Sequence, residues 1–298
     1  MAGCFILGGM VRARMALSAV LVLVACAGKP PQPPPGELWG DANQAFQDEA
    51  YQLAIERYKA FLDNYPFDEN AEEAELRIAR SYYLAARFPE AIAAFENFER
   101  MHPTSENLPA VEYQQGMSFA MQHGDAERDQ RYAQSALTAF RNVIDRFPYG
   151  PWASRAQLRI RECREALALH EARVADFYLD RKSLRAAEAR LAGVLGEYPD
   201  TDAAAQVLYS FATEYESRGE DTAAELAFAT LVHHRPDGPQ ATTARERLGA
   251  ENPLLAGPDP LPELLAWIAE ARDTASRLEV PRTVSAFPDS AESRQEQY

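Results

Sequence analysis

The sequence has few of the residues that a disulfide framework needs. Only three of its 298 residues are cysteine, and two of them, Cys4 and Cys26, lie in the N-terminal leader region. The third, Cys163, lies in an Arg-rich stretch with helical periodicity, where a lone thiol is typical of a packing residue. The body of the chain therefore has no internal disulfide to hold it together.

Basic residues are also scarce relative to acidic ones. Thirty Lys and Arg face 45 Asp and Glu, which gives a formal net charge of −15. Binding to a phosphate backbone requires a basic face, so no nucleic-acid partner is expected. This charge suits a soluble protein, or one whose partners carry basic patches.

Catalytic and metal-binding motifs are missing from the sequence. It has no phosphate-binding glycine loop, nucleophile elbow or paired-cysteine motif. Its five histidines show no metal-ligand spacing, and His102 takes a pre-proline position where three other copies of the repeat have Tyr or Phe. The acidic cluster at residues 72–75 is typical of a solvated first helical turn. We expect a protein that is not an enzyme and has no cofactor or metal.

The chain begins with a segment typical of a bacterial lipoprotein leader. Arg12 and Arg14 precede an apolar run that ends in Leu23-Val24-Ala25-Cys26. These four residues resemble a lipobox, which predicts a signal peptide at 1–25 and a lipidated Cys26. The alternative is an ordinary signal peptide with a chance cysteine. By resemblance to lipoprotein sorting rules, Ala27 points to the outer membrane, where several acyl chains would anchor the protein firmly.

A proline-rich tether follows the cysteine. Five prolines in Lys29–Gly36 favour polyproline II, so residues 26–36 form a semi-stiff spacer whose proline-rich part spans roughly 20 Å.

A helical pattern of 13 residues then recurs five times, beginning with a small residue and ending with a proline. Large apolar residues follow the small residue at offsets of 4 and 7, which places them on one helix face. The five copies are Ala54–Pro66, Ala91–Pro103, Ala136–Pro148, Ala187–Pro199 and Ala224–Pro236. Such recurrence predicts a repeat protein.

A second small residue lies twelve positions before the first in four of the copies, at Ala42, Ala79, Ala175 and Ala212. Two helices with small residues at their crossing and a closing proline resemble the tetratricopeptide repeat. The sequence therefore predicts an all-α, tetratricopeptide-like solenoid of five helix pairs. In the third copy, Gly116 and Phe119 match the first helix eight residues early, which predicts a longer polar loop around Gly124–Asp129.

The spacing of the closing prolines is unequal, at 37, 45, 51 and 37 residues. No helix breaker occurs between Trp152 and Asp180, so the longest spacing predicts one helix of nearly thirty residues joining repeats three and four. We expect it to divide the chain into an N-terminal half at 37–150 and a C-terminal half at 151–249. A short capping helix is expected at Gln240–Leu248.

The proline-rich tail at 250–298 is expected to end the ordered array and to be partly disordered. Within it, Leu264–Leu278 has the periodicity of one further amphipathic helix.

In the tetratricopeptide register, the first helix of each pair lines a concave groove. Several aromatics and one arginine there suit an extended peptide with apolar side chains and a terminal carboxylate. The candidate groove residues are Trp39, Asn43, Phe46, Leu76, Arg80, Tyr83, Tyr113 and Met117. The alternative for about half of these aromatics is a place in the core between helices.

The lipobox, the tether, the repeats and the long helix together resemble the BamD (ComL) family of outer-membrane lipoproteins over residues 36–236. The stretches that carry the resemblance are Asn64–Phe67, Met101–Thr104, Arg128–Asp129, Val174–Tyr178 and Glu197–Thr201. The resemblance implies a scaffold of the β-barrel assembly machinery, anchored by lipid at the periplasmic face of the outer membrane.

The same resemblance implies partners for each half of the chain. The N-terminal half would bind the C-terminal strands of unfolded outer membrane proteins. The C-terminal half would dock on a BamA-like barrel subunit through Arg190, beside other lipoproteins of the machinery. Two other functions stay open: a periplasmic repeat adaptor in Tol–Pal or cell-wall coordination, and a cell-wall enzyme with a repeat appendage.

Overall fold

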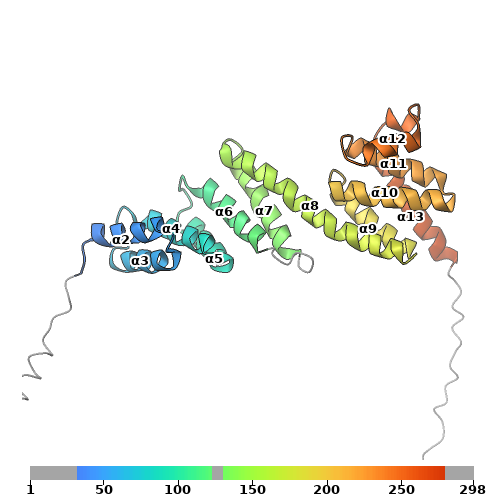
Figure 1. Cartoon of the computed structure of the whole chain (residues 1–298). Helices are drawn as coiled ribbons and strands as arrows, with labels where there is room; N and C mark the ends of the chain where they lie inside the picture. Colours follow the sequence, from blue (N-terminus) through green and yellow to red (C-terminus); the bar gives the residue numbers. More distant parts are fainter. Residues whose placement is uncertain (1–31, 123–129, 279–298) are drawn as a thin grey trace, which may run out of the picture. The chain divides into compact units, whose positions relative to one another are not determined.

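The described part of the chain is built from helices alone (Figure 1). The computed structural model describes residues 32–122 and 130–278, and within these ranges it contains twelve α-helices, one short 3₁₀ helix and no strand. The contacts divide the chain into two compact units, with the boundary in the sequence between Ser105 and Glu106. The predictions for the leader, for Cys26, for the 124–129 loop and for residues 279–298 lie outside the described residues.

The first unit contains the first two predicted helix pairs. Helix α2 packs on α3, and α4 packs on α5. Their bounds are α2 Pro35–Gln47, α3 Tyr51–Asn64, α4 Ala71–Leu84 and α5 Phe88–Met101. Helix α2 takes in the last two residues of the predicted tether, with Pro35 at a first-turn position where its missing N–H costs nothing.

The second unit contains the remaining three pairs and the C-terminal helices. Helix α6 packs on α7, α8 on α9, and α10 on α11. The bounds are α6 Leu108–Met121, α7 Arg131–Arg146, α8 Pro151–Asp180, α9 Leu184–Glu197, α10 Asp202–Arg218, α11 Asp221–His234, α12 Ala241–Leu248, the 3₁₀ helix η1 Pro253–Leu255 and α13 Leu261–Leu278. The predicted all-α fold of five pairs is confirmed, and α12 confirms the short helix expected at Gln240–Leu248.

The residues that define the repeat are the residues that form the core. All five small residues of the second helices are at most 2% exposed, and so are the large residues four and seven positions later. These large residues are Tyr58, Phe95, Phe140, Leu191 and Phe228, and then Phe61, Phe98, Val143, Val194 and Leu231. The small residue lets two helices approach closely, and the large residues fill the space beside the crossing.

A recurring turn joins the two helices of four of the pairs. The backbone N–H of Arg87 donates to the carbonyl of Tyr82 (2.9 Å) and that of Ala86 to Tyr83 (3.0 Å), which is the Schellman arrangement. This turn needs a residue in the left-handed region. The first, second, fourth and fifth pairs place Glu49, Ala86, Lys182 and Gly219 there, at φ of 59°, 56°, 59° and 74°. Only the fifth pair uses glycine, for which this conformation is unstrained.

The long helix predicted between repeats three and four is confirmed. Helix α8 runs without interruption for 30 residues, about 45 Å at 1.5 Å per residue. It packs on α7 with its first half and on α9 and α10 with its second half. Because α8 belongs to both neighbours, repeat three groups with repeats four and five. The division at Ser105 therefore differs from the predicted boundary between residues 150 and 151, and that boundary stays a prediction.

The ordered array continues beyond the point where the sequence predicted its end. After the proline-rich residues 253–260, α13 returns to pack against α11 and α9. Leu264 and Ile268 are at most 1% exposed, and the ring of Trp267 lies 5.1 Å from that of Tyr215. The Tyr215 hydroxyl donates to Glu188 on α9 at 3.0 Å. Burial raises the pKa of the Tyr215 hydroxyl. Helix α13 therefore covers the last repeat, although the sequence suggested only a possible helix in a partly disordered tail.

The left-handed turns predict that Ala86→Gly stabilises the protein, because the change removes the Cβ strain at φ 56°. We expect a gain of about 0.5–1 kcal/mol in the free energy of unfolding, measured by urea titration. The reciprocal change Gly219→Ala should lose about 1 kcal/mol. A lower free energy of unfolding in Ala86→Gly would show that the left-handed backbone of Ala86 does not strain the folded protein.

Gly116 is the small residue at the crossing of the third pair. A Cβ there would lie 2.7 Å from Cε1 of Phe140, a ring that is completely buried. We expect Gly116→Ala to cost about 1–3 kcal/mol of stability through overpacking. Gly193 is the matched control, because it lies inside α9 with open space around its Cβ position. Gly193→Ala should stabilise the protein by about 0.5–1 kcal/mol. If Gly116→Ala and Gly193→Ala changed the free energy of unfolding in the same direction, overpacking against Phe140 would be contradicted.

Candidate partner-binding surfaces

The candidate groove residues on α2 belong largely to the packing of the first pair. Trp39 is half-buried, with its ring 5.6 Å from that of Tyr58 and 5.5 Å from that of Phe61. The amide oxygen of Asn43 accepts a hydrogen bond from the Tyr58 hydroxyl at 2.8 Å. Phe46 is half-buried beneath the guanidinium of Arg77, 4.8 Å from its ring centroid. Each side chain contacts the core with one edge and keeps another partly open to solvent.

The three candidates on α4 differ in accessibility. Leu76 is completely buried, so its side chain is not available to a peptide in this structure. Arg80 is half-buried, and burial lowers the pKa of its guanidinium while nearby Glu73 opposes that shift. Tyr83 is half-buried, with its ring 5.8 Å from that of Phe88. Arg80 and Tyr83 are thus the two candidates on this helix that are not fully buried.

The second unit contains the remaining two candidates, Tyr113 and Met117 on α6. Both are half-buried and pack on the core formed by α7 and the first half of α8. The Tyr113 ring lies 5.5 Å from Phe140 and 5.2 Å from Trp152. Arg159 donates to the Tyr113 hydroxyl at 3.4 Å. Together with the α2 residues, these contacts place most of the predicted groove aromatics against a core, the alternative that the sequence had left open for half of them.

The candidate docking residue Arg190 lies on the outer side of α9. Its guanidinium pairs with the Glu171 carboxylate of α8 at 3.0 Å, and 48% of its side chain is exposed. The pair holds the arginine in one place while leaving it accessible, so it can still meet a carboxylate from outside.

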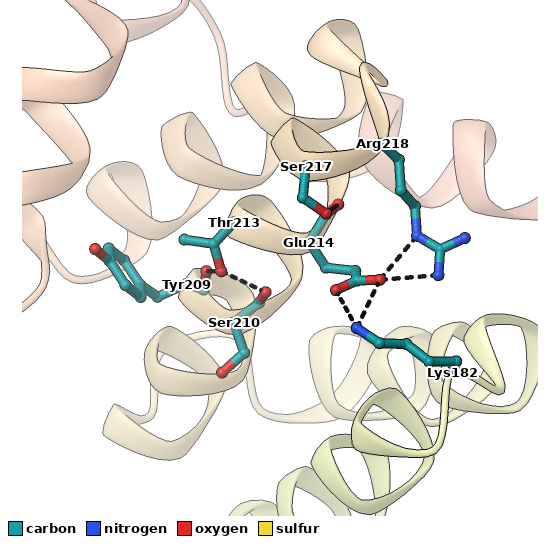
Figure 2. Close-up of polar contacts among 7 residues, drawn as sticks. All are labelled: Lys182, Tyr209, Ser210, Thr213, Glu214, Ser217 and Arg218. Atoms are coloured by element: carbon teal, nitrogen blue, oxygen red, sulfur yellow. Dashed lines mark hydrogen bonds and ion pairs between the residues drawn. The ribbon is translucent and has the colours of Figure 1, made fainter.

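The end of α8 is tied to the last repeat by a small polar cluster (Figure 2). Lys182, in the turn after α8, donates to both carboxylate oxygens of Glu214 on α10, at 3.1 and 3.4 Å. Arg218 donates to the same carboxylate at 2.9 Å. The Lys182 ammonium and the Arg218 guanidinium hold the pKa of Glu214 below its usual range. This cluster links the turn between α8 and α9 to α10.

A charged cavity of about 660 Å³ lies beside α8, at the start of α10 and the end of α11. Its charges are used within the fold. Glu165 accepts from the backbone N–H groups of Asp202 and Ala203 at 2.8 Å each, a favourable place for an anion at a helix N-terminus. Arg164 pairs with Asp200, and Arg235 pairs with Asp202. We therefore interpret this cavity as part of the packing between α8, α10 and α11 and not as a ligand site.

The cysteine and histidines that the sequence analysis examined as reactive or metal-binding residues take part in packing or in contacts with carboxylates. Cys163 is buried, and burial raises the pKa of its thiol to about 11. His102 packs on Phe98 and lies 2.9 Å from the carboxylate of Glu75, while His234 lies 3.1 Å from Asp259. Across residues 32–122 and 130–278, no group of three or more His, Cys, Asp or Glu has the arrangement of a metal site. No helix in these ranges is both long enough and apolar enough to cross a membrane.

Two exposed aromatics were not singled out from the sequence. Phe67 is 100% exposed and Tyr149 is 96% exposed, each directly after the closing proline of its repeat. The signal was present in the repeat alignment, because the other three repeats have Thr104, Asp200 and Asp237 at this position.

Comparison with known proteins identifies the family. The model of an outer membrane lipoprotein family, YfiO, matches residues 31–231. The outer membrane protein assembly factor BamD of Vibrio cholerae is 30% identical over 222 residues, which cover 70% of this chain and 92% of the relative. The chain belongs to the BamD family. The BamD of Pasteurella multocida is 29% identical over 227 residues, 72% of this chain and 86% of its own length. That of Neisseria meningitidis is 26% identical over 218 residues, covering 70% and 82% respectively. The family expected from the repeat order is confirmed.

Proposed function

We propose that this chain is an outer-membrane lipoprotein scaffold that takes part in the assembly of outer membrane β-barrel proteins. One observation carries the proposal: similarity to assembly factors extends over 92% of the length of the Vibrio cholerae relative. The match therefore takes in nearly the whole relative and is not confined to one helical repeat, which would be weak evidence by itself.

The proposed attachment to the membrane is the lipid on Cys26. The cysteine ends the lipobox-like Leu23–Cys26 and stands six residues before the first described residue. Several acyl chains on one residue give firm anchoring without a spanning helix. On this proposal the repeats lie at the periplasmic face of the outer membrane.

The proposed substrate surface is the first helix of the N-terminal repeats, which would bind C-terminal strands of unfolded barrel proteins. Half-buried aromatics such as Trp39, Phe46 and Tyr83 offer rigid apolar edges at little entropic cost. Arg80 would meet the terminal carboxylate of the strand, because a guanidinium matches a carboxylate in a bidentate fashion. Leu76 is left out of this surface because it is buried.

The proposed docking surface for a BamA-like barrel subunit is the exposed side of α9 around Arg190. No step in this function requires catalysis: binding two partners near each other supplies the effect, and we propose that the protein is a scaffold rather than an enzyme.

The proposed function predicts the effect of depletion in cells. Depleting the protein should lower the amounts of several unrelated barrel proteins in the outer membrane, measured by quantitative mass spectrometry of that fraction. Lipoproteins without a barrel serve as the internal control and should stay constant. Unchanged barrel levels after complete depletion would refute the proposal.

The docking surface predicts a selective effect of charge reversal. Arg190→Glu should reduce co-purification of a large outer-membrane barrel subunit with the lipoprotein by about tenfold or more, since losing one partner of a desolvated ion pair costs about 2–5 kcal/mol. Arg161→Glu, which reverses another exposed arginine of the second unit, should leave recovery unchanged. Recovery of Tol–Pal components in place of a barrel subunit would favour the adaptor function.

A further inference from the structure

Phe67 is held on a short turn that leaves its side chain completely open to solvent. The turn follows α3: the backbone N–H of Asp68 donates to the carbonyl of Tyr65 at 3.2 Å, so Pro66 and Phe67 occupy its two central positions. The Asp68 carboxylate then accepts from the N–H of Asn70 at 2.9 Å. Proline and these bonds restrict the backbone on both sides, so Phe67 is presented outward on a defined support and not on a loose loop.

The fold itself does not require an aromatic residue at this place. The same position after the closing proline is Thr104 in the second repeat, Asp200 in the fourth and Asp237 in the fifth. Phe67 contributes nothing to the core because it is 100% exposed. A large apolar side chain on a fixed turn thus costs solubility and gains no packing within the described chain, which suggests a contact outside it.

The proline-rich tether enters the fold at this same corner. The side-chain amide of Gln32 donates to Asn64 at 2.7 Å, and the Tyr65 hydroxyl donates to the carbonyl of Pro33 at 2.8 Å. Asn64 and Tyr65 are the residues directly before the Pro66–Phe67 turn. The chain that leads back to Cys26 therefore starts beside Phe67, and the six residues from Cys26 to Gln32 can span at most about 20 Å.

We propose that Phe67 inserts into the surface of the same membrane that holds the acyl chains of Cys26. The inference rests on the lipid anchor of the proposed function. At most about 20 Å of chain separates the anchored cysteine from Gln32, which contacts Asn64 just before the turn. This confines the turn to the neighbourhood of the lipid surface, so even a single aromatic has a high effective concentration there. Phenylalanine is among the apolar side chains that surface-bound segments bury at the boundary between headgroups and acyl chains.

The charges around the turn set the depth and the lipid preference of this contact. Asp63 and Glu69 are exposed on either side of Phe67. Carboxylates stay in the headgroup layer, so the ring enters only its outer apolar boundary. They also repel anionic lipids, so insertion is stronger on zwitterionic lipid and weakens as the anionic fraction rises.

The consequence is a defined orientation of the first unit. A lipid tether alone lets a domain rotate, whereas a second contact beside the tether turns the C-terminal end of α3 toward the membrane. The exposed Leu53 near the other end of α3, about 16 Å away along the helix axis, would then face away from the lipid.

The test labels the full-length lipidated chain at single introduced cysteines. Phe67→Cys carries an environment-sensitive fluorophore, and Leu53→Cys is the control. Cys163 does not compete for the label, because it is buried and its thiol has a pKa of about 11. Each protein is reconstituted into phosphatidylcholine vesicles, and the measurements are emission wavelength and quenching by spin-labelled lipid.

We expect the label at position 67 to shift to the blue and to be quenched several-fold more strongly than the label at position 53. Both effects should weaken when phosphatidylglycerol is added. Equal, water-like signals at the two positions in anchored protein would overturn the proposal. A blue shift only when outer-membrane partner proteins are co-reconstituted would assign Phe67 to a protein contact and overturn it as well.

Two controls keep this test separate from the proposed function. Mass spectrometry and vesicle flotation first establish acylation and anchoring. A missing lipid contradicts the proposed anchor at Cys26. A water-like signal from the label on anchored protein contradicts only the proposed insertion of Phe67. An unlabelled Phe67→Thr chain should keep the circular dichroism spectrum of the parent, because threonine occupies this turn position in the second repeat. In that chain, a label placed at Glu69→Cys should be quenched less by spin-labelled lipid than in the parent.

Discussion

Close approach of paired helices at an alanine is the constraint on which the rest of this structure depends. Ala54, Ala91, Ala136 and Ala187 have no exposed surface, and each is followed on its own helix by buried large side chains that fill the adjoining space. A solenoid has no single central core, so each pair must bury its own apolar face and that of its neighbour. The closing proline and the left-handed turn serve this packing by fixing where each helix stops.

Because the repeat-defining positions are all used for packing, the remaining positions are available for binding at the surface. The first helices leave half-buried edges, such as those of Trp39 and Tyr83, and α9 leaves Arg190 half exposed beside Glu171. Features on the connecting turns are freer still: Phe67 and Thr104 occupy the same turn position with entirely different chemistry. The repeats thus separate a fixed interior from variable turns, which is where we place the membrane contact.

Much of the fold could be predicted because its determinants are local. The offsets of 4, 7 and 12 residues lie within a single helix and its end, so Phe61 or Phe98 could be assigned to the core from sequence alone. The return of α13 could not, because the burial of Leu264 depends on α9 and α11, which lie far away along the chain. The groove prediction was less sharp for the same reason: the helical register places Leu76 and Tyr113 on a face, but only the neighbouring helices decide how much of each remains open. The place of Phe67 beside the tether could not be predicted either, because it depends on contacts of Gln32 and Pro33 with Asn64 and Tyr65 that no periodic pattern contains.

The continuity of α8 has a consequence for how this chain can change over generations. Where two repeats are joined by a turn, as between α9 and α10, an added residue can be absorbed without disturbing either helix. Inside a continuous helix there is no such slack, since one inserted residue turns everything beyond it by about 100° and advances it by 1.5 Å. The faces that α8 presents to α7 and to α9 therefore have a fixed rotation relative to each other. Insertions or deletions within residues 151–180 preserve both contacts only when they add or remove close to a whole number of helical turns. The length of this one helix should be among the most slowly drifting properties of the protein.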